Sequence, residues 1–177
     1  MTDRASGCAV ALVLAIVGGV AGCGAAPGAA PPKAAVGAVG ALVVSDGRIA
    51  EPIGANPAVL YFTIGNRGLS DDALVAVTVE GAGRSDIHRT SRRGSLAWME
   101  PAAEIAIPAG ASVDFAPGGN HVMVQGGEKR LRRGARVSVR LVFRRAGSLD
   151  FPVPVLVYRD LDRVLAGAGK GARQRPE

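Results

Sequence analysis

Residues 58–64 read Ala-Val-Leu-Tyr-Phe-Thr-Ile, and Gly-Asn-Arg-Gly follows at once at 65–68. The first stretch is rich in β-branched and aromatic residues, which predicts a β-strand, and the glycines after it predict a turn. Short apolar runs separated by Gly or Pro recur at intervals of about 8–12 residues as far as residue 158. Because no segment keeps a helical period of 3.6, the sequence predicts an all-β, antiparallel sandwich.

The remaining strands are expected where apolar and polar residues alternate or where valines gather. Arg92-Arg93-Gly94-Ser95 predicts a hairpin between two of them. Trp98 is expected in the core, and two prolines in the last run predict an edge strand there. The expected segments are 42–44, 73–79, 86–90, 96–99, 104–107, 112–115, 120–124, 136–144 and 149–158.

The chain of 177 residues has room for one domain with appendages. Its formal charge of +6 would suit an acidic partner or anionic lipid. Nucleic acid is not expected as a partner, because aromatic residues make up only 4% of the chain. No cysteine follows Cys23. That excludes an electron-transfer cupredoxin, which needs a cysteine ligand, and a thiol-disulfide reductase.

The N-terminal region has the pattern of an exported lipoprotein. Residues 9–20 form an apolar run too short to span a bilayer, which indicates a signal peptide over residues 1–22. The run ends Val-Ala-Gly-Cys, which resembles a bacterial lipobox with Cys23 as the lipidated residue; the alternative is a chance cysteine after an ordinary signal sequence. We expect an Ala/Pro/Gly tether over 23–41, the β-domain over 42–160 and a disordered basic tail over 161–177.

Every histidine and every methionine except Met1 lies in one stretch, in the order His88, Met99, His121, Met123. Neutral imidazole and thioether are ligands that suit Cu(I), so these four residues are candidate metal ligands. In an extended strand His121 and Met123 point to the same side. Taken singly, each of these residues would more often be an ordinary core or surface residue than a metal ligand. Asp86 either orients the imidazole of His88 or is a solvated carboxylate, and we favour the second.

The spacing His88-x10-Met99-x21-His121-x-Met123 resembles the PCu(A)C copper chaperones. The resemblance extends to residues 58–66, 104–110 and 115–123 and covers about residues 42–158. It implies a cupredoxin-like, Greek-key β-sandwich that binds one Cu(I) through those four residues. It also implies delivery to the copper centre of cytochrome c oxidase, with an oxidase subunit or a Sco-type protein as partner. Arg89 stands where members of the family often carry Met.

The expected protein is thus not an enzyme but a copper carrier, held on the outer face of the bacterial cell membrane by lipidated Cys23. No recognised nucleophile motif supports a hydrolase. The alternative is a membrane-anchored β-sandwich lipoprotein that acts as a protein-interaction module without physiological metal. Its docking surface would be basic, with Arg130, Arg132, Arg133, Arg144 and Arg145 as candidate residues.

Overall fold

The computed structural model describes residues 35–161. This part of the chain forms eleven β-strands and a short helical turn at residues 158–161. The predicted signal peptide, Cys23 and nearly all of the predicted tail lie outside the described residues. Within residues 35–161, no helix has the length and apolar character needed to cross a bilayer.

The strands run through the described chain with short connections. They are β1 (Ala35–Val39), β2 (Leu42–Ala50), β3 (Ala58–Asn66), β4 (Asp72–Val79), β5 (Arg84–Arg93), β6 (Leu96–Pro101), β7 (Ile105–Ile107), β8 (Ser112–Phe115), β9 (Asn120–Gln125), β10 (Arg136–Phe143) and β11 (Gly147–Leu156). The all-β prediction is confirmed, including the hairpin at Gly94-Ser95, which joins β5 to β6.

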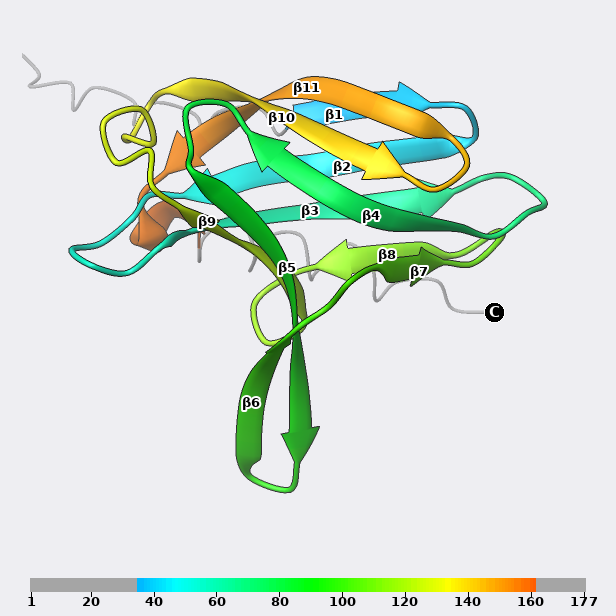
Figure 1. Cartoon of the computed structure of the whole chain (residues 1–177), viewed down its shortest axis with the longest axis horizontal. Coiled ribbons are helices and arrows are strands. Elements are labelled where there is room, and N and C mark those ends of the chain that lie inside the picture. The colour runs from blue at the N-terminus through cyan, green and yellow to red at the C-terminus, as the bar shows by residue number, and fades with distance from the viewer. Residues whose placement is uncertain (1–34, 162–177) are drawn as a thin grey trace, which may run out of the picture. The chain divides into compact units, whose positions relative to one another are not determined.

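Hydrogen bonding connects the strands in the order β6-β5-β9-β8-β3-β2-β11-β10-β4-β7, with β1 added to β2 and β9 also paired with β3. Strand β11 joins two groups of strands, because it pairs with β10 along most of its length and then runs parallel to β2 at Val155 and Leu156. Its prolines precede the pairing with β2, so they lie where β10 is its hydrogen-bonded neighbour. Figure 1 shows the hairpin of β5 and β6 extending away from the other strands.

Alternating apolar residues of both groups of strands form one buried core. Leu60, Phe62 and Val122 contribute from the β2-β3-β9 side, and Leu74 and Leu141 contribute from the β4-β10 side. The rings of Phe62 and Phe115 stack with centroids 4.2 Å apart. This core fixes the sheet register at β9, because a slip of one residue would turn Val122 outward and His121 inward.

Three boundaries or positions differ from the sequence prediction. Residues 35–39 form β1 although they were expected in the tether; Gly37 lets β1 lie close to β11, since a Cβ there would meet Leu149 Cδ2 at 3.0 Å. Leu161, expected in the tail, is buried against Ala50 and Tyr61. Trp98 is 46% exposed and not in the core, because it lies on the extended hairpin.

The sheet is also mixed, not wholly antiparallel as predicted. The β11–β2 and β8–β9 pairings are parallel, and each is only one or two residue pairs long. Both are short contacts at the end of a strand whose other pairings are antiparallel, and an alternating sequence pattern does not reveal such contacts.

Candidate metal centre

The two histidines face each other across neighbouring strands. His88 of β5 pairs directly with His121 of β9 in an antiparallel ladder. Their ring centroids are 5.8 Å apart, and the ring planes are inclined by 39°. A nitrogen ligand lies about 2 Å from a bound transition-metal ion, so two nitrogens can share an ion when they are about 4 Å apart or closer. The centroid separation is compatible with one ion between the two rings.

Both methionines lie on the same face of the sheet as the histidines. Met123 follows His121 by two residues and pairs with Asp86, which itself precedes His88 by two. Met99 of β6 pairs with Thr90, which follows His88 by two residues. Directly opposed residues, and residues two apart, share a face of a sheet. The four predicted ligands are therefore brought together on one face by three adjacent strands.

The ring of His121 is buried and lies within hydrogen-bond distance of a backbone carbonyl. Its side chain is only 6% exposed, and its Nδ1 lies 3.1 Å from the carbonyl oxygen of Gly119. If Nδ1–H donates to that carbonyl, Nε2 carries the free lone pair that a metal needs. The Pro-Gly-Gly turn supplies this carbonyl, and Gly118 in that turn has a positive φ of 76°. Sequence reasoning identified the turn but not its role in orienting His121.

His88 has a buried nitrogen without a partner. Its Nδ1 makes no hydrogen bond within the described part of the chain. Burial lowers the pKa of His88, nearby His121 and Arg84 lower it further, and Asp86 opposes them. The imidazole is thus favoured in its neutral form, which is the form that binds a metal. A buried polar atom without a partner is costly, and a bound cation would satisfy it.

Several charged residues lie around the candidate ligands. Asp86 forms an ion pair with exposed Arg84, with Nε and Oδ2 2.7 Å apart, and its own side chain is 22% exposed, so it remains a partly solvated carboxylate. Arg89 pairs with Asn120, which places it on the opposite face from His88. Arg92 does share the face of His88, and it packs so closely over Gly118 that a Cβ there would meet its Nη2 at 2.9 Å.

The donors differ strongly in exposure. His121 is buried, His88 and Met123 are partly buried, and Met99 is 60% exposed. In the described residues, no three side chains of His, Cys, Asp or Glu lie close enough to hold a metal ion together. The remaining donors on this face are the thioethers of Met99 and Met123. The donor set is soft, and its exposed member lies on the extended hairpin.

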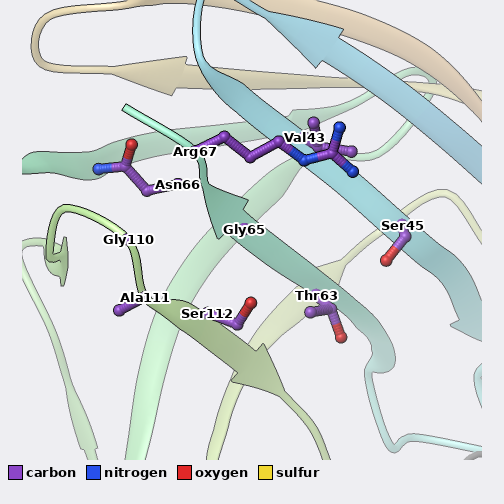
Figure 2. Close-up of a pocket in the computed structure, with 9 residues that line it drawn as sticks. All are labelled: Val43, Ser45, Thr63, Gly65, Asn66, Arg67, Gly110, Ala111 and Ser112. Carbon is purple, nitrogen blue, oxygen red and sulfur yellow. The ribbon is translucent and has the colours of Figure 1, made fainter. Parts of the chain in front are cut away.

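A polar hollow of about 240 Å³ lies on the same face, at the far end of β3. Figure 2 shows the hydroxyl groups of Ser45, Thr63 and Ser112 around it, with Arg67 beside them. Thr63 donates a hydrogen bond to Asp114. Since the lining includes no His, Met or Cys, we assign no soft-metal binding to this hollow.

The family of the chain follows from its strand-forming region. The family model described as "Putative lipoprotein LpqE-like" matches residues 42–155. The chain belongs to the LpqE-like family. A curated relative, "Putative lipoprotein Lxx21020" of Leifsonia xyli subsp. xyli (strain CTCB07), is 29% identical over 103 residues. That match covers 58% of this chain and 62% of the relative, so the chain spans less than two thirds of the relative's length.

Solved structures confirm the resemblance to PCu(A)C domains and the cupredoxin-like fold of this LpqE-like protein. The apo PCuAC domain from PmoF1 is 30% identical with a TM-score of 0.60, and the match covers 69% of this chain and 98% of that domain. The copper-bound PCuAC domain from PmoF2 is 24% identical with a TM-score of 0.59, and the match covers 69% and 97% of the two chains. Because its identity to this chain is only 24%, the match to the PmoF2 domain supports a shared fold and nothing further.

Proposed function

We propose that this LpqE-like protein is an extracytoplasmic copper chaperone that binds one Cu(I) through His88, Met99, His121 and Met123. The observation that carries the proposal is the direct pairing of His88 with His121, with both methionines on the same sheet face. The fold is shared with PCuAC domains, one of which, from PmoF2, has been solved with copper bound.

The chemistry of the donors favours carrying copper over catalysis. Thioether and neutral imidazole suit Cu(I), whereas carboxylate and water suit Mg, Ca or Mn. These ligands leave the ion exchangeable, so thiolates of a partner take it by ligand exchange without a redox step. In this proposal the protein is not an enzyme, and the copper ion leaves in the oxidation state in which it was bound.

The place of action in this proposal is the outer face of the bacterial cell membrane. The lipobox-like sequence before Cys23 and the lipoprotein description of the family support a lipid anchor at that cysteine. The acceptor would be a membrane-facing copper protein, and we propose the copper centre of cytochrome c oxidase, reached directly or with a Sco-type protein. The support for this acceptor is the resemblance to PCu(A)C chaperones.

An anaerobic titration with Cu(I) against a competing chelator tests the copper site. We expect one equivalent to bind, and we expect His121→Ala and Met99→Ala each to weaken it. Leu96→Ala is a matched control, because Leu96 is on the same strand as Met99 but points to the other face. A titration that shows no binding would reject the chaperone function and leave the metal-free interaction module as the better account.

A further inference from the structure

Strand β6 is an open edge of the sheet. It stands at the end of the strand order and pairs with β5 alone among the described strands. All six of its residues are exposed. Leu96 is 72% exposed and Trp98 is 46% exposed, which is unusual for large apolar side chains that alternate on one face. This edge is therefore unpaired, and it is apolar from Leu96 to Met99.

The hydrogen bonds of β5 show which backbone groups of β6 point outward. The amide of Thr90 donates to the carbonyl of Gly119, on the side away from β6. Opposed residues in an antiparallel ladder either exchange both hydrogen bonds or none, so Thr90 and Met99 form a pair without hydrogen bonds. The amide and carbonyl of Met99 consequently point outward, and by alternation those of Ala97 do too.

Proteins usually protect such an edge with charge, proline or a covering segment. Here Glu100 and Pro101 protect one end, Glu100 by its charge and Pro101 because it has no amide hydrogen to offer. Ala97 and Met99 remain open, and Met99 is also the most exposed proposed copper ligand. Arg92 and Arg93 lie on the adjacent strand, are exposed, and form no ion pair within residues 35–161. The edge thus offers backbone pairing next to uncompensated positive charge.

We propose that an extended, acidic segment of the copper-accepting protein docks on β6 by strand addition. Main-chain bonds to Ala97 and Met99 would align the segment, and the arginines at the hairpin tip would select for acidic residues. This places the acceptor beside Met99, the ligand that must release the ion. The inference rests on the proposed function and adds the face and chemistry through which copper leaves.

The rate of Cu(I) transfer to a defined acceptor tests the docking. The donor is the full copper-loaded protein, and the probe is the apo, soluble copper domain of a cytochrome c oxidase subunit. Ala97→Pro removes one outward amide, and proline is tolerated at a sheet edge whose N–H faces solvent. We expect transfer to slow by about three- to tenfold, the range for one lost hydrogen bond. Ala97→Val keeps the amide and should transfer at the wild-type rate.

Charge reversal tests the acidic partner independently. Arg93→Glu should slow transfer and reduce its dependence on ionic strength, because rim charges act mainly on the rate of encounter. Arg132→Glu is the matched control, since it makes the same change of net charge in the loop between β9 and β10. Transfer to a small thiol chelator should be the same for all variants, because a small molecule needs no strand.

The outcomes separate the docking from the copper site. Binding of one Cu(I) by every variant, with slower transfer to the protein acceptor alone, supports the docking. Equal rates for Ala97→Pro and Ala97→Val, or no transfer from the wild type to the domain, overturn it. A wild-type dimer that Ala97→Pro converts to a monomer overturns it in favour of a second copy on β6. Absence of copper binding rejects the proposed function instead.

Discussion

Loss of His121 should weaken copper binding more than loss of Met99. His121 is 6% exposed, and its Nδ1 is already within hydrogen-bond distance of Gly119 O, so the ring is ordered when the protein folds. Met99 is 60% exposed, so we expect its side chain to lose conformational freedom when it binds the ion. Removing Met99 therefore removes both a bond to copper and the entropic cost of making that bond.

The size of the difference follows from the exposure of Met99. Immobilising a methionine costs about 1.5–2 kcal/mol in side-chain entropy. We scale this cost by the 60% exposure of Met99. The entropy lost on ordering its side chain then offsets about 1 kcal/mol of the free energy gained from its bond to copper. Since 1.4 kcal/mol is about a tenfold change in affinity, His121→Ala should reduce affinity by at least about fivefold more than Met99→Leu.

Competition with a Cu(I) chelator under anaerobic conditions measures both losses. Met99→Leu removes the sulfur and nearly keeps the volume, and Leu96→Ala controls for changes to the exposed hairpin. Circular dichroism should show the same fold in all variants. An equal loss at the two positions, or a larger loss at Met99, would refute the reasoning that His121 is ordered in advance.

Three further outcomes are expected. Copper affinity should fall as pH decreases, because protonated imidazole cannot bind the ion. The pKa of His88 is lowered, chiefly by burial, so this imidazole should protonate at a lower pH than an unperturbed histidine. Asp86→Asn should lower that pKa further, because Asp86 raises it, and NMR titration of the apo protein can check this. Phe62→Ala should lower the free energy of unfolding by about 3–5 kcal/mol in urea denaturation, because this fully buried ring stacks on Phe115; an unchanged midpoint would contradict the core assignment. Cys23→Ser should move the protein from the membrane fraction to the soluble fraction, and unchanged fractionation would count against the lipid anchor.

Local sequence pattern was sufficient for most of the sandwich but not for its boundary. Residues 58–64 have strong strand propensity, and β3 extends from Ala58 to Asn66. Residues 35–39 read Ala-Val-Gly-Ala-Val, which has the composition of a linker, yet they form β1. The pairing with β2 and the close approach of Gly37 to Leu149 stabilise β1, and a local pattern cannot reveal either contact.

The candidate site was predictable within one strand and not between strands. The alternation of residues in a strand placed His121 and Met123 on one face. The position of His88 opposite His121 depends on the register of two strands that are more than 25 residues apart in sequence. Trp98 shows the same limit, because an apolar run predicts a strand but does not indicate that its hairpin extends beyond the core.

The unequal exposure of the four proposed ligands determines which of them a copper acceptor can reach first. The Nδ1 atom of His121 lies within hydrogen-bond distance of Gly119 O in the Pro-Gly-Gly turn. Met99 instead belongs to edge strand β6, where its backbone amide and carbonyl point away from β5. In the proposed site an incoming ligand would therefore meet Met99 first, and replacing its thioether would leave the ion bound by the two histidines and Met123 until further exchange occurs. Because Met99 and the backbone edge belong to the same strand, a partner that pairs with β6 changes the surroundings of the ligand that is easiest to displace. Docking and release are then coupled through one residue.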